Sequence, residues 1–198
     1  GLPADRLQEL LSWVKPVHLP ILDPAQFVGM TPITTTDMSI THQPGAGDYS
    51  ADAIRITTTA AVTNKSLLCP LPAPLEAGVA ARPVRAGQQV HFRVKCSDWT
   101  KVTRLYVGLC QGGGYANRRF FNICADSAGS SFGHRDATYD TAWSGKYRTF
   151  PACATRFISS GTPTAWGYDS RYFAPITGIF FTVSASAAVT FDFDRIYS

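Results

Sequence analysis

The sequence predicts an all-β protein: an antiparallel two-sheet β-sandwich of the jelly-roll kind, with a short α-helix at its N-terminus. Three observations predict this fold. Apolar and polar residues alternate with a period of two over most of residues 33–198. The 16 glycines and 13 prolines are spread along the chain, which suits many short strands joined by turns. The 198 residues are 45% apolar and only 16% charged, which is typical of one globular domain with a large core.

Residues 1–32 are predicted to form a helix and an extended linker, and residues 33–198 the sandwich. Pro3 and Asp5 suit the first turn of a helix, and Pro16 ends it. Four residues recur at helical spacing and form an apolar face: Leu7, Leu10, Leu11 and Val14. A helix this short needs a surface against which to pack. That surface is either the sandwich or identical helices of neighbouring chains, and the second alternative would make an oligomer such as a homotrimer.

About eight segments of the sandwich have the pattern of strands with one buried and one solvated face. They are residues 51–60, 64–71, 88–96, 104–110, 118–125, 146–150, 176–184 and 187–197. The alternation predicts that the following side chains point inward: Ile54, Ile56, Val90, Phe92, Val94, Cys96, Leu105, Val107, Leu109, Ile179, Phe181, Val183, Val189, Phe191 and Phe193. It places Asp192 and Asp194 on the outward side of the last strand.

Charge and hydropathy exclude two classes of partner. The 18 basic and 14 acidic residues give a net charge of +4, which is mild and favours an anionic partner such as an acidic polysaccharide. Nucleic-acid binding needs denser basic clusters, and only Arg118 and Arg119 are adjacent. No apolar run approaches the ~20 residues that cross a bilayer, and no signal peptide precedes the domain. We therefore expect no membrane insertion, and we expect the chain to be a segment of a longer protein.

The five cysteines are an odd number, so at least one is unpaired or bonded outside the chain. Cys96, Cys110 and Cys124 each close a strand-like run, where a free cysteine acts as a small core hydrophobe. This pattern favours reduced thiols made in a cytosol. The chain has no C-x-x-C pair and its four histidines are scattered, so we expect no zinc site.

Four segments, taken in order, resemble a known kind of module. They are ADAIRITTTA (51–60), HFRVKCSDWTKVTRLYVGL (91–109), SGKYRTF (144–150) and ITGIFFTVSASAAVTFDFDRIYS (176–198). Together they resemble the jelly-roll modules found beside polysaccharide deacetylases and esterases and in phage tail fibre or tailspike proteins. Tyr147 stands where these modules usually have an aromatic residue. The resemblance implies the fold that the alternation already predicts, and a non-catalytic role in glycan recognition or as a spacer.

The same resemblance implies a structural calcium ion near the first and last strands. Asp194, in FDFDRI, occupies the position of a ligand in such modules, and Asp48 or Asp52 are the available partners. Calcium requires six or more oxygen ligands, which these residues alone do not supply. The alternative is that Asp194 is solvated or paired with an arginine.

Few residues suggest catalysis. The chain has no H-E-x-x-H, phosphate-binding or EF-hand motif. Gln89 and His91 match the Gln-x-His pair of jelly-roll polysaccharide lyases, in which the histidine would act as base and a tyrosine as acid. The Arg118–Arg119 and Tyr147–Arg148 pairs lack the sequence context of such lyases. The simpler interpretation is that Gln89 and His91 point to solvent from a strand.

Binding residues concentrate in three segments predicted as loops at the ends of the sandwich. Aromatic rings there can stack on sugar rings, while charged and amide groups hydrogen-bond the hydroxyl groups. The predicted binding residues are Tyr115, Asn117, Arg118 and Arg119 in the first segment, Tyr139 and Trp143 in the second, and Trp166, Tyr168, Asp169, Arg171 and Tyr172 in the third. The alternative for each aromatic residue is packing at the core or edge of the sandwich, and Trp99 is expected to be structural.

These patterns favour a non-catalytic glycan-binding or receptor-binding module. Its parent would be a phage tail fibre or tailspike protein, or a bacterial polysaccharide-processing protein. The partner would be a cell-surface polysaccharide, and the location a virion engaged in host adhesion or the outside of a cell. Two alternatives remain: a structural or oligomerisation domain without a ligand, and a polysaccharide lyase or esterase. Apart from the calcium ion, no cofactor is expected.

Overall fold

The computed structural model describes residues 20–28, 36–71, 89–111, 118–124, 140–159, 162–164 and 176–197. These residues form eleven β-strands, two short 3-10 helices and one short α-helix. The helix predicted for the N-terminal segment lies outside the described residues and stays a prediction. No helix among the described residues has the length and apolar character needed to cross a membrane.

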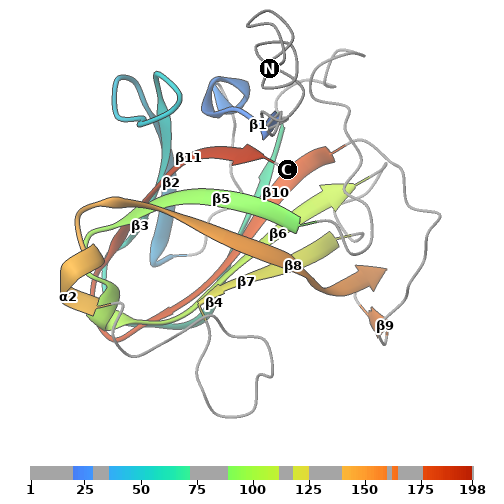
Figure 1. The fold of residues 1–198 in the computed structure, drawn as a ribbon. Coiled ribbons are helices and arrows are strands. Elements are labelled where there is room, and N and C mark those ends of the chain that lie inside the picture. Colours follow the sequence, from blue (N-terminus) through green and yellow to red (C-terminus); the bar gives the residue numbers. More distant parts are fainter. Residues whose placement is uncertain are drawn as a thin grey trace, which may run out of the picture.

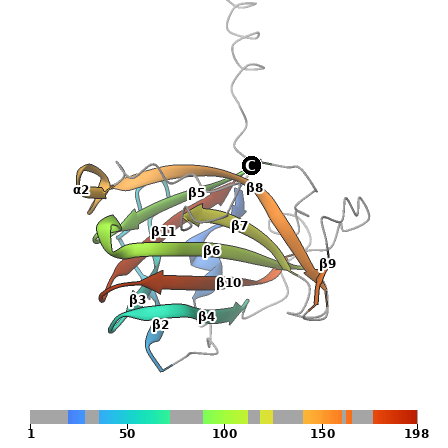
Figure 2. The same ribbon diagram turned by 90° about the horizontal axis from the view of Figure 1, so that it is seen from below.

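The strands form two antiparallel sheets, so the predicted all-β sandwich is confirmed (Figures 1 and 2). The first sheet contains, in spatial order, β2 (Met38–Gln43), β3 (Ala53–Thr58), β11 (Thr190–Tyr197), β5 (Gln89–Cys96) and the start of β8 (Tyr147–Ser159), and β1 (Pro20–Leu22) also pairs with β11. The second sheet contains the rest of β8, then β7 (Arg118–Cys124), β6 (Val102–Gln111), β10 (Ile176–Ala185) and β4 (Val62–Pro70), and β9 (Thr162–Thr164) pairs with β8.

Strand β8 belongs to both sheets. Its first residues pair with β5, from Tyr147 opposite Lys95 to Cys153 opposite Gln89. From Ala154, which lies opposite Phe121, the same strand pairs with β7. One long strand therefore joins the two sheets along one side of the sandwich (Figure 2). The sequence predicted only the first four residues of this strand, Tyr147 to Phe150.

The core lies between the two sheets. Phe92 of β5 packs against Phe121 of β7 with ring centroids 5.3 Å apart, and Phe181 of β10 packs against Phe193 of β11 at 5.0 Å. Every side chain predicted to point inward is at most 2% exposed, which confirms the alternation. Because burying one large apolar side chain stabilises a fold by roughly 1.5–3 kcal/mol, these inward-facing side chains are the main source of stability.

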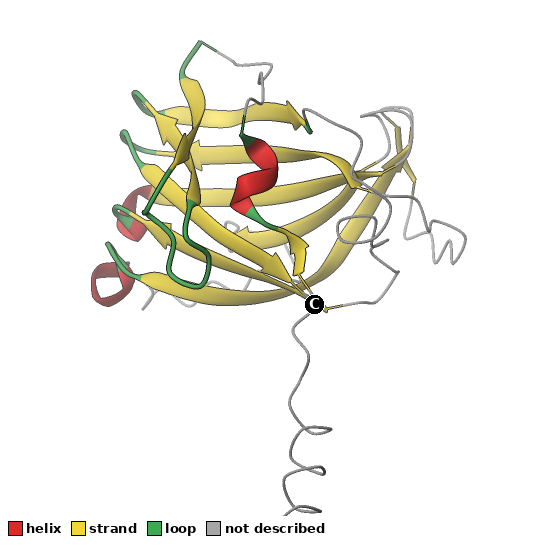
Figure 3. Ribbon diagram, turned by 90° about the horizontal axis from the view of Figure 1, so that it is seen from above, coloured by secondary structure: helices red, strands yellow, loops and turns green. Residues whose placement is uncertain are grey.

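Three short helices lie at the ends of strands (Figure 3): η1 (Pro24–Phe27), η2 (Trp99–Lys101) and α2 (Asp140–Trp143). Asp98 caps η2, because its carboxylate accepts a hydrogen bond from the Thr100 amide at 2.9 Å, and the bonds from Thr100 lower the pKa of Asp98. Trp99 is 4% exposed and packs against Phe150 and Phe191, which confirms its structural role.

Part of the predicted linker is a strand of the sheet. In β1, Pro20 pairs with Tyr197 and Leu22 with Ile196, so this segment adds to the first sheet. Strands β2 and β9 were also not predicted. Three-residue strands such as β1 and β9 are too short for a period of two to be recognised.

Asp192 and Asp194 lie on the outward side of their strand as predicted, but neither is exposed to solvent. Both residues lie on the side of β11 away from the phenylalanine core, yet each is only 2% exposed. Arg55 and Lys95 cover Asp192, and the loop between β2 and β3 covers Asp194. A second layer of polar contacts therefore lies on the outer face of the first sheet.

Two of the three cysteines predicted to act as core hydrophobes, Cys96 and Cys110, are buried. Cys69, Cys96 and Cys110 are buried and form no disulfide. Burial, and then the proximity of Cys110, raise the pKa of Cys69 far above its usual value. The side chains of the other two cysteines, Cys124 and Cys153, lie outside the described part of the chain.

Candidate functional site

The outer face of the second sheet carries aromatic rings and hydroxyl groups side by side. On β4, β10 and β6, the residues that alternate with the buried core are half-buried: Ser66, Leu68, Tyr106, Phe180 and Thr182. We call these five residues the β4–β10–β6 face. The strands hold it rigidly, because β10 is paired with β4 on one side and with β6 on the other.

The strand register sets two rows across this face. Thr182 lies opposite Ser66 on one side and Tyr106 on the other. Phe180 lies opposite Leu68 and Gly108. Tyr106 and Phe180 are therefore diagonal neighbours on adjacent strands, a relation in which aromatic side chains ~7–8 Å apart still make contact.

Two glycines leave part of this face without side chains. Gly108 and Gly178 lie in the same strands as Tyr106 and Phe180, and both are buried. Gly108 is directly opposite Phe180, so no side chain on β6 competes with the phenylalanine ring for the space above the strand. The face therefore has ring surfaces beside a flat stretch of backbone.

A polar network holds the edge of the face next to Tyr106. The Arg104 guanidinium donates to the side-chain oxygen of Asn64 and lies 5.7 Å from the centroid of the Tyr106 ring. The backbone amide of Asn64 donates to the Ser184 hydroxyl at 2.8 Å. Asn64 has a φ of 50°, a left-handed conformation that asparagine tolerates better than most residues. On the other side of β10, the hydroxyls of Ser66 and Thr182 lie 3.1 Å apart.

Sequence reasoning missed Tyr106 and Phe180 as functional candidates. Both lie in strands that the alternation predicts correctly, at the positions between the inward residues. The available signal was an aromatic residue at an outward position of a strand.

Most of the predicted binding residues lie outside the described part of the chain and stay predictions: Tyr115, Asn117, Tyr139, Trp166, Tyr168, Asp169, Arg171 and Tyr172. Arg118 and Arg119 lie in strand β7 and not in a loop, with Arg118 paired to Cys110 and Ile158. The side chains of Arg118 and Arg119 are outside the described residues.

Trp143 is half-buried at the end of α2, where it packs against the core. Its ring meets Phe150 edge-on with centroids 6.1 Å apart, and the Arg148 guanidinium lies 5.3 Å from its ring centroid. These contacts favour the packing alternative for Trp143.

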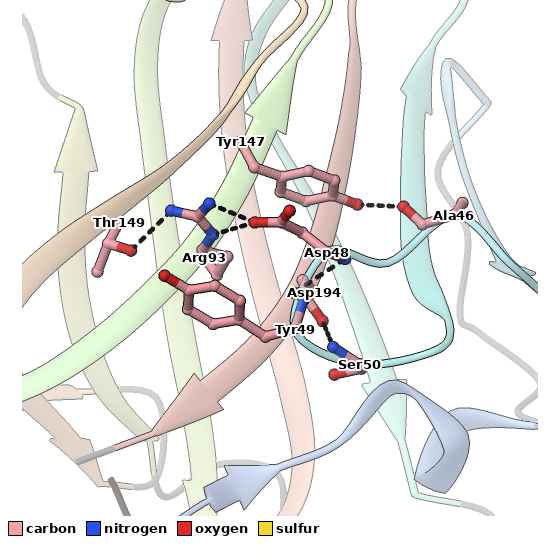
Figure 4. A network of polar contacts seen from close by, with 8 residues as sticks. All are labelled: Ala46, Asp48, Tyr49, Ser50, Arg93, Tyr147, Thr149 and Asp194. Atoms are coloured by element: carbon pink, nitrogen blue, oxygen red, sulfur yellow. Dashed lines mark hydrogen bonds and ion pairs between the residues drawn. The ribbon is translucent and has the colours of Figure 1, made fainter.

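The residues around Asp194 do not fit a calcium site (Figure 4). Its carboxylate accepts hydrogen bonds from the backbone amides of Asp48 at 3.2 Å, Tyr49 at 2.5 Å and Ser50 at 2.9 Å. Calcium needs oxygen ligands, and these neighbours present N–H groups instead. The carboxylate of Asp48 binds Arg93, and that of Asp52 binds His42 at 3.0 Å. Within the described ranges, no three His, Cys, Asp or Glu side chains are grouped as metal ligands.

The lyase alternative is not supported by the arrangement of its proposed residues. His91 lies in β5 of the first sheet and stacks on Tyr197, with ring centroids 5.1 Å apart. Arg118 and Arg119 lie in β7 of the second sheet, and β8 separates the two strands. The predicted base and the arginine pair therefore lie on strands of different sheets.

No family model matches the sequence, and no curated protein matches it. Solved structures do resemble it. The family 30 carbohydrate-binding module of a cellulosomal cellulase of Clostridium thermocellum aligns with a TM-score of 0.51 and 9% identity over 92% of this chain and 97% of that chain. A family 11 carbohydrate-binding module of another cellulosomal cellulase of the same organism aligns with a TM-score of 0.48 and 14% identity over 89% and 91% of the two chains.

The family 11 module has also been solved with a β-1,3-1,4-mixed-linked tetrasaccharide, and that structure aligns with a TM-score of 0.45 and 12% identity over 90% of this chain and 93% of that chain. At these identities, the similarity to the family 30 module shows a shared fold. The chain is thus a β-sandwich with the fold of a family 30 carbohydrate-binding module.

Proposed function

We propose that this chain is a non-catalytic carbohydrate-binding module and that the β4–β10–β6 face contacts the sugar. The observation that carries the proposal is the placement of Tyr106 and Phe180, which form a diagonal aromatic pair on the outward side of two adjacent strands. The hydroxyls of Ser66 and Thr182 lie beside them at 3.1 Å from each other.

The chemistry of this face matches a sugar. A pyranose ring has apolar C–H faces that stack on aromatic rings, and its rim carries hydroxyl groups that need hydrogen-bond partners. The fold shared with a module that is itself carbohydrate-binding supports the same ligand class.

The charges on the face favour a neutral glycan. Among the side chains described here, Arg104 is the charged group at the edge, and its guanidinium is already bonded to Asn64. A carboxylated glycan would require a cation free to pair with it. We therefore expect neutral polysaccharides to bind better than acidic ones, in contrast to what the net charge alone suggests.

The test is a glycan array, followed by calorimetry on the best ligand. Tyr106→Ala and Phe180→Ala should each lower the affinity about two- to twelvefold, because stacking on one aromatic ring is worth roughly 0.5–1.5 kcal/mol. Thr63→Ala, at an exposed position of the same sheet, is the matched control and should bind normally. Equal affinity in all three variants would reject the face as the binding site, and an empty array would reject glycan binding.

The predicted loop residues extend this proposal. Trp166→Ala in the same calorimetric series tests the third loop segment, and a loss of affinity would add that loop to the site. Trp143→Ala should reduce stability more than affinity, because Trp143 packs against Phe150.

The parent protein is proposed to be a bacterial polysaccharide-processing protein or a phage tail protein that binds a host receptor, acting outside the cell or on a virion. Light scattering separates the two contexts. The phage tail hypothesis requires a trimer, and a monomer at high protein concentration would contradict it. A trimer that binds no glycan would favour the structural alternative.

A further inference from the structure

We propose that Tyr49 forms a second sugar contact, on the outer face of the first sheet. Tyr49 lies in the loop of residues 44–52 between β2 and β3, hereafter loop 44–52. The proposal takes only the ligand class, a neutral glycan, from the proposed function. The site itself is separate, because the β4–β10–β6 face belongs to the other sheet.

The buried carboxylate of Asp194 fixes the middle of loop 44–52. Three successive backbone amides, those of Asp48, Tyr49 and Ser50, donate to its two oxygens. Hydrogen bonds to an ionised carboxylate are among the strongest in proteins, and these three hold the backbone on both sides of the Tyr49 ring. Figure 4 shows Asp194 directly beneath this part of the loop.

The start and end of the loop are fixed as well. Asp52 accepts hydrogen bonds from the His42 ring at 3.0 Å and from the Gly45 amide at 3.2 Å. The Tyr147 hydroxyl donates to the backbone oxygen of Ala46 at 2.7 Å. Burial, followed by the carboxylates near it, raises the pKa of Tyr147, so this hydroxyl stays a donor.

Arg93 fixes the ring of Tyr49. Its guanidinium lies 4.4 Å from the Tyr49 centroid and 5.9 Å from the Tyr147 centroid, so it is held between two aromatic rings. Its Nε also donates to Asp48 at 2.8 Å, and its Nη1 donates to the Thr149 hydroxyl at 3.1 Å. An arginine with this many partners has little freedom, and the ring stacked on it takes up a defined orientation (Figure 4).

Tyr49 as a residue is nevertheless 58% exposed, whereas the side chain of Arg93 is 17% exposed. One face of the ring therefore covers the arginine and the rest is open to solvent. A rigid, exposed tyrosine on a fixed loop loses little conformational entropy when a ligand stacks on it, and such anchors give affinity at low cost.

The surroundings of Tyr49 select the ligand class. The carboxylate of Asp48 next to it is 36% exposed and can accept a hydrogen bond from a sugar hydroxyl. Asp48, Asp52 and Asp194 together outnumber the one guanidinium of Arg93 in and under the loop. This excess of negative charge disfavours acidic glycans, so the site suits a neutral pyranose with a flat C–H face.

The experiment follows the backbone amide signals of residues 48–50 by 1H–15N NMR while cellotetraose, xylotetraose or tetragalacturonate is added. These amides bond to Asp194 and report on the loop directly. A neutral tetrasaccharide should shift them in a saturable way, and tetragalacturonate should not. The shifts should persist in Tyr106→Ala, which removes a ring from the other face. The affinity that these shifts report should fall at least tenfold in Tyr49→Ala. It should stay unchanged in Tyr49→Phe.

Asp194→Asn provides a second variant that tests the loop anchor. It should weaken the loop site while leaving the shifts of β6 and β10 amides unchanged. If no probe moves the amides of residues 48–50 while β6 and β10 amides respond, the second site is rejected and the proposed function stands. If neither region responds, both are rejected. If the loop shifts vanish in Tyr106→Ala, they arise from the main face, and the second site is rejected as well.

Discussion

Asp192 of β11 forms a two-point ion pair with Arg55 of the neighbouring strand β3. Arg55 donates from Nε to Oδ1 at 2.6 Å and from its terminal nitrogen to Oδ2 at 2.9 Å. From the other side, the Lys95 ammonium lies 2.9 Å from Oδ2. The carboxylate thus bridges three strands of the first sheet, with Tyr147 next in the same row opposite Lys95.

This pair predicts a loss of stability at acid pH. Burial alone would raise the pKa of Asp192, but the hydrogen bonds from Arg55 and Lys95 outweigh it and lower the pKa. A carboxyl whose pKa is lower in the folded state stabilises the fold above the unfolded pKa of about 3.9, and this stability is lost as the pH falls through the folded value. Urea unfolding at a series of pH values from neutral downward should show this decline.

Asp192→Asn isolates the effect. At neutral pH the free energy of unfolding of the variant should be about 2 kcal/mol lower, because Arg55 and Lys95 lose their charged partner in a buried position. The gap between variant and wild type should narrow as the pH falls below about 4. Asp37→Asn is the control, since its pair with Lys65 at 3.3 Å is exposed and contributes less than about 1 kcal/mol. A constant gap at all pH values would contradict the assignment.

Alanine substitutions at the two glycines of loop 44–52 should have different effects. A Cβ on Gly47 would lie 2.5 Å from the backbone oxygen of Asp52 and closer still to that of Ser50, so the backbone must move. Gly45 has a φ of +71° but open space around it, so alanine there meets only the left-handed penalty of roughly 1–2 kcal/mol. Gly47→Ala should therefore disturb the amide signals of residues 48–50, whereas Gly45→Ala should lower the melting temperature while keeping those signals in place. The reverse pattern would show that the loop is not packed as described.

The sequence predicted the core well because burial repeats with a fixed period. Phe181 and Phe193 follow the alternation of their strands and meet across the sandwich at 5.0 Å. Eight of the strands were predicted for the same reason. Strand β8 continues beyond its predicted end because it passes from one sheet to the other, and such a transition has no periodic signal.

The polar layer was not predictable in the same way. Alternation correctly placed Asp192 and Asp194 on the side away from the core, but it contains no information on what covers that side. Their partners Arg55 and Tyr49 come from distant parts of the chain, and only the order of the strands brings them together. For the same reason, Tyr106 and Phe180 become a pair only when β6 and β10 are known to be neighbours.

Calcium should have no effect at Asp194. The backbone N–H groups of residues 48–50 donate hydrogen bonds to both carboxylate oxygens of Asp194, so the loop is anchored without a metal. We expect the same melting temperature in EDTA and in millimolar calcium chloride. Asp194→Asn should cost about 2–3 kcal/mol, because the amide offers one acceptor oxygen and its NH2 group opposes the backbone donors. A melting temperature that rises with calcium would overturn this view and restore the metal site.

The buried thiols should react only after unfolding. Cys69, Cys96 and Cys110 are buried and form no disulfide, and burial raises the pKa of Cys69, which suppresses the reactive thiolate. Iodoacetamide at mildly alkaline pH should leave these three cysteines unmodified in the native protein and modify all three in guanidinium chloride, as read by peptide mass spectrometry. Because no disulfide joins them, a reducing agent should not lower the melting temperature through these residues. Rapid native labelling of Cys69 would mean that β4, at the edge of the second sheet, opens far more readily than its full burial against β10 implies.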